Sequence, residues 1–294
     1  MYQVDNAIIM AAGTSSRFAP LSYERHKALT IVRDEVLIER QIRQLLEKEI
    51  KEIYVVTGYK AEQFEYLKEK YGVKILHNPY YLSRNNNSSI YVAKEIIKNS
   101  YICSADNYFT DNPFEKEVDC SYYAAVYSNE YTDEWCMSVD EDGYIDSVSI
   151  GGKKSWFMYG HVFWGEDFSN AFLDILNKIY NKQETANKLW EEIFVDNLDT
   201  LKMKIRKYSQ DKIFEFDTLD ELREFDKSYI NDTKSSVLKD VAGKLNCNES
   251  EIVNIDAIKG KDFEAVGFTF DLRGNTYSYN YAENKIINIR GEKK

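Results

Sequence analysis

The sequence predicts an α/β fold: a Rossmann-like three-layer α/β/α domain with a mixed, mainly parallel central sheet, plus a small α+β C-terminal appendage. Short apolar runs alternate with amphipathic segments over residues 7–104, and the connections between them are short. This alternation is typical of a parallel sheet with helices on both faces. Composition changes at 231–236, a polar stretch without apolar periodicity, so we expect two domains, 1–230 and 237–294.

The expected elements follow from apolar spacing and turn residues. Strands are predicted at 7–10, 53–56, 73–76 and 101–104, and helices at 37–49, 60–71 and 90–97. The middle region, 122–164, is expected to be rich in strands. Helices are then predicted at 168–180 and, behind a capping box that starts at Thr218, to about 229. The tail should hold one helix, 237–245, and three strands, 268–272, 276–281 and 285–289.

Composition limits the classes of partner. The formal net charge is -11 at pH 7, and an acidic surface repels a phosphate backbone, so nucleic acid is not an expected partner. The four cysteines lack metal-ligand spacing, which is typical of reduced thiols in the cytosol. The first residues lack a basic leader, and no apolar run has the length of a membrane span. We therefore expect a cytoplasmic protein without membrane insertion.

A loop rich in small residues follows the first predicted strand. It reads Met10-Ala11-Ala12-Gly13-Thr14-Ser15-Ser16-Arg17, and His26-Lys27-Ala28-Leu29 comes shortly after. Gly13 and its neighbours would let the backbone approach a ligand, and exposed N–H groups bind phosphate oxygens. Arg17 and Lys27 add positive charge for a polyphosphate. In such sheets ligands bind beyond the carboxyl ends of the strands, where this loop and Asp106 are expected.

These residues resemble the A-A-G-x-x-S/T-R…K-A-L signature of the nucleotidyltransferase superfamily. Within it, the chain is similar to bacterial CTP:phosphocholine cytidylyltransferases over about 1–229, with further matching segments at 58–73, 85–87, 105–108 and 129–135. The resemblance implies a Mg²⁺-dependent enzyme that transfers CMP from CTP to a small phosphorylated amine, with phosphocholine as first choice. It implies catalytic roles for Lys27 and Arg17. The expected nucleotide-binding residues are Ala11, Ala12, Gly13, Thr14, Ser15, Asn87 and Ser88.

The resemblance also implies a metal site. Asp106, directly after the strand at 101–104, matches a metal ligand of the family, and Mg²⁺ prefers carboxylate oxygens. The second ligand is expected at Glu191, where the family has an aspartate directly after a tryptophan. Glu192 and Asp196 remain alternatives for that second position.

Recognition of a quaternary amine requires aromatic faces and a carboxylate. The family's choline-contacting tryptophan corresponds to Trp135, and Glu134 stands beside it. Trp190 would form a second wall of the acceptor site. The open alternatives for the acceptor are phosphoethanolamine, 2-aminoethylphosphonate and a sugar 1-phosphate.

The segment from Glu251 onward resembles the opening strands of a choline-kinase-like lobe, but it is too short to hold a kinase active site. A module that packs on the main domain or mediates self-association, making the protein a homo-oligomer, is the expected role. A second class of function stays open: a non-catalytic nucleotide-binding scaffold. The departure at Glu191 favours the scaffold, whereas retention of Gly13, Arg17, Lys27 and Asp106 favours the enzyme.

Overall fold

The computed structural model describes residues 1–260 and 264–289, so the end of the predicted tail, 290–294, lies outside the described residues. The chain forms two compact units. The first contains residues 1–13 and 37–215, and the second contains 14–36 and the C-terminal part from Phe216. Each unit is described by itself.

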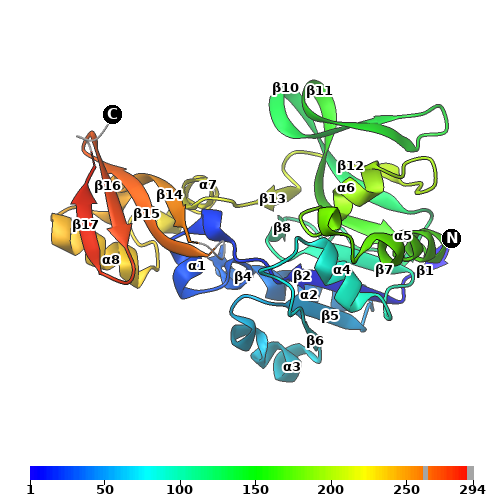
Figure 1. The fold of residues 1–294 in the computed structure, drawn as a ribbon, viewed down its shortest axis with the longest axis horizontal. Coiled ribbons are helices and arrows are strands. Elements are labelled where there is room, and N and C mark those ends of the chain that lie inside the picture. The colour runs from blue at the N-terminus through cyan, green and yellow to red at the C-terminus, as the bar shows by residue number, and fades with distance from the viewer. Residues whose placement is uncertain (261–263, 290–294) are drawn as a thin grey trace. The chain divides into compact units, whose positions relative to one another are not determined.

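The first unit is built on a seven-stranded mixed sheet in the order β12-β10-β11-β7-β2-β5-β6 (Figure 1). Parallel pairs join β2 to β5 and β7, β5 to β6, and β10 to β12, whereas β11 is antiparallel to both β10 and β7. The strands are β2 (Asn6–Ala11), β5 (Ile53–Thr57), β6 (Lys74–His77), β7 (Ser100–Ser104), β10 (Tyr122–Val139), β11 (Ile145–Trp164) and β12 (Lys204–Tyr208). The predicted α/β class with a mainly parallel sheet is confirmed.

Helices pack against this sheet and connect its strands. They are α2 (Leu37–Glu47), η3 (Ala61–Phe64), α3 (Tyr66–Tyr71), α4 (Asn87–Ala93), α5 (Glu166–Ile179), η4 (Gln183–Thr185) and α6 (Trp190–Val195). Apolar side chains of α4, α5 and α6 form one core cluster with those of β2, β7, β10 and β11. None of the helices in the described part of the chain has the length and apolar character that crossing a lipid bilayer requires.

Two short antiparallel pairs complete the first unit. β1 (Tyr2–Gln3) pairs with β9 (Glu117–Val118), and β8 (Asn107–Phe109) pairs with β13 (Ile213–Glu215). The second pair matters for function, because its register sets Glu215 opposite Asn107, the residue after Asp106. Segments more than 100 residues apart in the sequence are thereby joined at the carboxyl end of β7.

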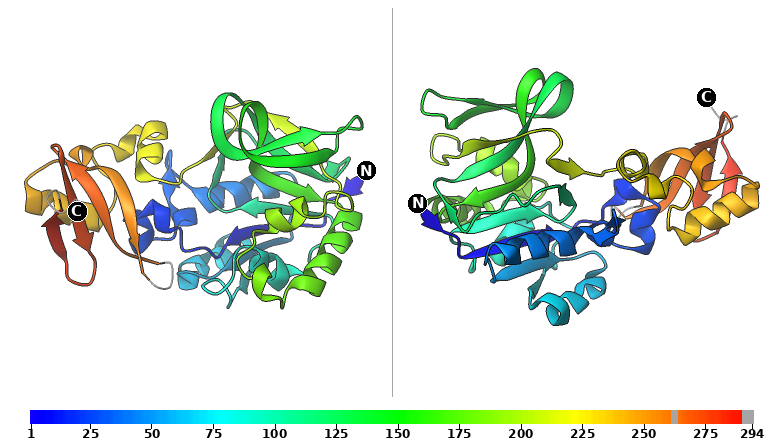
Figure 2. Two further views of the ribbon diagram at one scale, coloured as in Figure 1. Left: turned by 45° about the horizontal axis from the view of Figure 1, so that its top comes forward. Right: turned by 180° about the vertical axis from the view of Figure 1, so that it is seen from behind.

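The second unit combines the segment after the small-residue loop with the C-terminal part of the chain. It contains η1 (Ser16–Phe18), α1 (Leu21–Glu24), η2 (Lys27–Leu29), β3 (Ile31–Val32), β4 (Glu35–Val36), α7 (Leu219–Phe225), η5 (Lys227–Tyr229), α8 (Ser236–Leu245) and η6 (Glu249–Glu251). Its antiparallel sheet has the order β14-β15-β16-β17, with strands β14 (Val253–Lys259), β15 (Ala265–Leu272), β16 (Asn275–Asn280) and β17 (Lys285–Asn288). Figure 2 shows α8 lying along one face of this sheet.

The observed units differ from the expected boundary near 231–236. Glu24 of α1 explains why the early segment belongs with the tail: its carboxylate accepts hydrogen bonds from the N–H groups of Ser236 and Val237, at the start of α8. The capping box at Thr218 is present, since its Oγ1 accepts from the Glu221 N–H at 3.2 Å. The tail also has one more strand, β14, than the three predicted.

Candidate active site

The small-residue loop begins where β2 ends. Ala11 and Ala12 are buried, and the carbonyl of Ala12 accepts from the N–H of Tyr59 at 3.0 Å. The glycine at 58 is required, because a Cβ there would lie 2.7 Å from the Ala12 carbonyl oxygen. A Cβ at Gly13 would meet no heavy atom of the described residues within 4 Å. The loop is thus held at Ala12 by the hydrogen bond from Tyr59, whereas the space beside Gly13 is open. Such open space lets a ligand approach the backbone closely.

In the second unit, the loop continues through Thr14 and Ser15, and the latter has a φ of 51°. Arg17 and Lys27 converge on the same carboxylate. Arg17 Nη1 lies 2.6 Å from Asp217 Oδ2, and Lys27 Nζ lies 3.1 Å from Asp217 Oδ1.

The two cations differ sharply in exposure, because the Lys27 side chain is 4% exposed and that of Arg17 is 69% exposed. The Lys27 ammonium is therefore held in a fixed place, whereas the guanidinium is accessible to a ligand. Sequence reasoning paired neither cation with Asp217.

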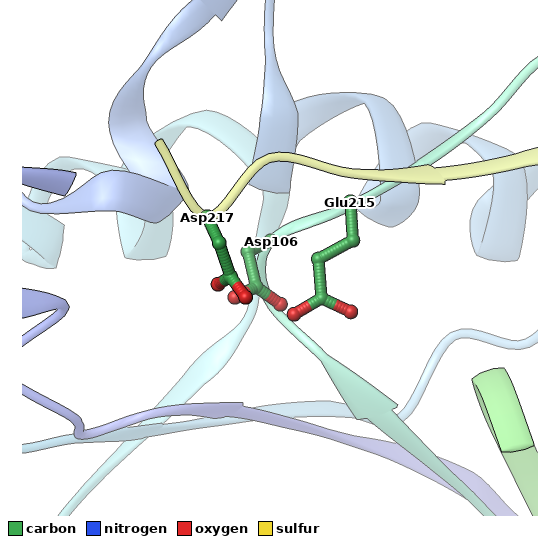
Figure 3. A group of neighbouring side chains, drawn as sticks. All are labelled: Asp106, Glu215 and Asp217. Atoms are coloured by element: carbon green, nitrogen blue, oxygen red, sulfur yellow. The ribbon is translucent and has the colours of Figure 1, made fainter. Parts of the chain in front are cut away.

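In the first unit, two carboxylates meet at the end of β7. One oxygen of Asp106 and one of Glu215 lie within 4.8 Å of each other (Figure 3). Ser104 Oγ donates to Asp106 Oδ1 at 2.7 Å, and the N–H of Glu215 donates to the Tyr159 hydroxyl at 2.9 Å. Hard oxygen donors of this kind suit Mg²⁺.

Asp217 follows Glu215 by two residues, a stretch of chain that spans at most about 7 Å. Sequence reasoning missed Glu215 as a metal-ligand candidate. The available signal was the alternation Phe214-Glu215-Phe216-Asp217, which places two acids on one face of an extended segment.

The structure adds Glu215 as a candidate for the second metal ligand, and the prediction of Glu191 for that position stays a prediction. The acidic group suited to a metal contains Glu215 and does not include Glu191. Glu191 instead accepts a hydrogen bond from Asn86 Nδ2 at 3.0 Å, and Asn86 Oδ1 accepts from the N–H of Trp190 at 2.7 Å. Burial raises the pKa of Glu191 to about 7, although the hydrogen bond from Asn86 opposes the rise.

Glu191 belongs to a cluster of acids around Tyr123. Burial raises the pKa of the Tyr123 hydroxyl well above its usual value, and the negative charges of Glu191, Glu215 and Glu134 raise it further. The predicted acceptor residue Glu134 is exposed. Three carboxylates from distant parts of the first unit thus act on one phenol.

The two predicted acceptor tryptophans have different environments. Trp135 is half-buried and lines a cavity of about 240 Å3 together with Glu192 and Asp196, among other residues. Trp190 is 2% exposed, stacks on Tyr123 with ring centroids 5.8 Å apart, and belongs to the core cluster. The ring of Trp190 is therefore part of the core, and its role as a second wall of the acceptor site stays a prediction.

The predicted nucleotide contacts at Asn87 and Ser88 stay predictions, and both side chains are buried and bonded to protein. Asn87 Nδ2 donates to the carbonyls of Thr185, at 2.9 Å, and Lys188. The Ser88 hydroxyl donates to the carbonyl of Asn85 at 2.8 Å. Both residues thereby fix the start of α4 and the segment before α6.

The comparisons with known proteins agree with this geometry. Residues 7–132 match the family described as MobA-like NTP transferase domain. The chain is 34% identical to choline-phosphate cytidylyltransferase of Streptococcus pneumoniae over 77% of its length and 99% of that protein. It is 31% identical to 2-aminoethylphosphonate cytidylyltransferase of Lancefieldella rimae over 76% of its length and 93% of that protein.

The solved structures show the same relation. CTP:phosphocholine cytidylyltransferase from Streptococcus pneumoniae (LicC) aligns with a TM-score of 0.73, over 76% of this chain and 99% of that one. The inositol-1-phosphate CTP transferase from T. maritima, at 13% identity and a TM-score of 0.59, shares the fold.

Fold and site together define a nucleotidyltransferase, an enzyme that moves a nucleotidyl group. Within that class, the chain belongs to the family of the bacterial CTP:phosphocholine cytidylyltransferases.

Proposed function

We propose that this enzyme uses Mg²⁺ to transfer CMP from CTP to phosphocholine, giving CDP-choline and pyrophosphate. The observation that carries the choice of acceptor is the cavity in which the aromatic ring of Trp135 stands beside two carboxylates, Glu192 and Asp196. Such a concentration of negative charge stabilises a cationic head group and disfavours a neutral sugar. The names of the relatives, with phosphocholine and 2-aminoethylphosphonate as acceptors, support a phosphorylated or phosphonylated amine.

The donor side rests on Gly13, Arg17 and Lys27. In the transfer, a phosphate oxygen of the acceptor attacks the α-phosphorus of CTP, and the bond from that phosphorus to the pyrophosphate oxygen breaks. Lys27, fixed in the second unit, supplies a positive charge that needs no reorganisation as the reaction proceeds. Arg17, being exposed, would hold the leaving pyrophosphate by paired N–H donors.

Asp106 and Glu215 are the proposed metal ligands, in place of the pair with Glu191. Their two oxygens fit the donor preference of Mg²⁺, and the hydrogen bond from Ser104 orients the first carboxylate. The bound ion would neutralise charge on the phosphate oxygens during transfer. Ala11, Ala12, Thr14 and Ser15 remain the proposed contacts of the nucleotide.

Glu191 and Glu134 would face the ammonium group, and Trp135 would supply an aromatic face to it. A half-buried tryptophan stabilises a cation by about 0.5–2 kcal/mol. With Trp190 in the core, the aromatic part of the site is smaller than predicted, and carboxylates contribute more of the recognition. This arrangement also suits a primary ammonium, so 2-aminoethylphosphonate is the second candidate acceptor.

The test is pyrophosphate release by the purified full chain with CTP and Mg²⁺. Phosphocholine, phosphoethanolamine, 2-aminoethylphosphonate and a sugar 1-phosphate are compared as acceptors, and ATP, GTP and UTP as donors. We expect the highest kcat/KM with CTP and phosphocholine. A preference for another amine would change the acceptor only, whereas the absence of turnover with every pair would favour the non-catalytic scaffold.

A further inference from the structure

A second cavity lies within the second unit, and neither Arg17 nor Lys27 lines it. Its volume is about 240 Å3, below the roughly 300–1,000 Å3 of pockets for drug-sized ligands. The segment from Leu21 to Ile31 forms one wall, and Tyr229 with the segment 233–235 forms the other. A cavity of this size fits a small metabolite and is too small for a nucleotide.

Two cations, Arg25 and Lys234, line this cavity beside the same aromatic ring. Lys234 Nζ lies 4.4 Å from the centroid of the Tyr229 ring. Burial raises the pKa of Tyr229 to about 12, and the positive charge of Arg25 opposes the rise, so Arg25 also acts on this phenol. Within residues 1–260 and 264–289, neither cation forms an ion pair with a carboxylate. The charge of Lys234 also helps to lower the pKa of Asp226 and Asp232, so Arg25 and Lys234 are cations without a direct ion pair in a chain of net charge -11.

Thr30 provides an independent observation. Its side chain lines the cavity and the residue is 6% exposed, yet its hydroxyl has no hydrogen-bond partner among the described residues. Since this hydroxyl is not one of the fully buried polar atoms, it stays accessible from the cavity and can bond a ligand there. The Tyr229 hydroxyl, in contrast, is already used, because it donates to the carbonyl of Ile31 at 2.6 Å.

The one carboxylate in the wall is directed elsewhere. Glu24 accepts hydrogen bonds from Ser235 Oγ at 2.5 Å and from the N–H groups of Ser236 and Val237. These bonds hold its pKa below the usual value despite burial, so it stays ionised while it caps α8. The positive end of the α8 helix dipole balances the charge of Glu24, so Arg25 and Lys234 remain available to bind a ligand.

We propose that this cavity is an anion site for a small phosphate monoester, bound by Arg25, Lys234 and the Thr30 hydroxyl. A phosphate group accepts charge-assisted hydrogen bonds from both cations and an ordinary one from the hydroxyl. The site is separate from the proposed CTP site and does not depend on the proposed reaction. It is built jointly from the segment next to Lys27 and from residues that open the C-terminal appendage.

The test is calorimetric titration of the full chain with inorganic phosphate at constant ionic strength. The variant Arg25→Gln/Lys234→Gln is compared with Lys227→Gln/Lys285→Gln, which removes the same charge at two exposed lysines of the second unit. We expect the first variant to lose affinity about tenfold or more, because two charge-assisted bonds are removed, and the second to bind as the wild type does. Thr30→Val, which keeps the shape of the side chain, should weaken binding severalfold.

Lys27→Ala separates this site from the catalytic loop. If the cavity is the site, Lys27→Ala retains phosphate binding. The proposal is overturned if phosphate binding in the Lys27→Ala background survives Arg25→Gln/Lys234→Gln, if it is lost equally in the charge-matched control, or if Lys27→Ala alone removes it. Circular dichroism verifies that each variant is folded, and Thr30→Val alone decides the matter if the double variant is not.

Discussion

The two units of the molecule carry opposite charges at the places where chemistry is expected. In the first unit, Asp106 and Glu215 meet at the end of β7, and Glu191 and Glu134 add to the negative potential around Tyr123. In the second unit, Arg17 and Lys27 converge on a single carboxylate. The first unit is therefore suited to cations, a metal ion and an ammonium group, and the second to phosphates.

This difference explains how an acidic protein can bind CTP. Positive charge need not cover the surface, because it is concentrated on a short segment whose lysine is buried and fixed. Asp217 compensates both cations in the second unit, so a polyphosphate would compete with it for Arg17 and Lys27. The comparison predicts that variants in the two units fail in different ways.

The largest effect is expected at the carboxylate pair. Asp106→Asn and Glu215→Gln should each lower kcat by about a thousandfold or more. Each variant loses one negatively charged metal ligand, so the metal ion would neutralise less of the charge that develops on the phosphate oxygens. Both should also need more Mg²⁺ for half-maximal rate. The measurement is pyrophosphate release over a Mg²⁺ titration.

Glu191→Gln is the matched control for this prediction. It removes the same charge in the same unit, and we expect its Mg²⁺ dependence to match that of the wild type. A shift in Glu191→Gln with none in Glu215→Gln would restore the original assignment of the metal site.

A smaller loss is expected in the second unit, and its size should follow burial. Lys27→Met should lower kcat by about a hundredfold, in the range of a preorganised donor to developing charge. Arg17→Gln should cost about tenfold, mainly as weaker CTP binding, since its side chain is 69% exposed and solvent screens its charge. Steady-state kinetics with varied CTP separates the two, and equal losses would show that burial of Lys27 has no catalytic value.

The acceptor should respond to the ionisation of Glu191. Its pKa of about 7 means that the carboxylate gains charge as the pH rises through neutrality. The KM for phosphocholine should fall several-fold between pH 6.5 and 8.5 in the wild type, about the effect of one added charge contact. In Glu191→Gln the KM for phosphocholine should be higher than in the wild type and should not fall over this pH range. An identical pH profile in both proteins would show that Glu191 is not part of the acceptor site.

The smallest effect concerns stability. The folded-state pKa of Glu191 lies above its ordinary value of 4.5, so the folded protein holds the proton more tightly than the unfolded chain. The contribution of this group to the free energy of unfolding is thus most favourable below about pH 4.5 and is lost as the pH rises to about 7. Relative to wild type, Glu191→Gln should gain about 3 kcal/mol between pH 4.5 and 8.

Urea unfolding followed by tryptophan fluorescence measures this difference, since Trp164 and Trp190 lie in the core of the first unit. Glu192→Gln, the neighbour on the same helix, serves as the control and should show no such trend. A wild type and a Glu191→Gln variant with parallel pH curves would contradict the assigned pKa.

Much of the fold was predictable because it depends on local patterns. Apolar runs marked β2, β5 and β7, and the capping residues at Thr218 marked the start of α7. The loop around Gly13 was found from residue types alone, because close backbone approach and phosphate binding require small and cationic residues in a fixed order. The strand β14 and the composition of the second unit were not predicted, because they depend on which segments pack together.

The same distinction applies to single residues. The sequence by itself determined the class of protein, the cationic loop and the importance of Asp106, since these follow from order along the chain. Only the tertiary structure brought Glu215 close to Asp106, through the β8–β13 pairing, and showed that Trp190 is a core residue whereas Trp135 lines a cavity. The physical reason is that burial and carboxylate proximity are properties of distance in space, and chain segments about 100 residues apart in sequence set that distance only on folding.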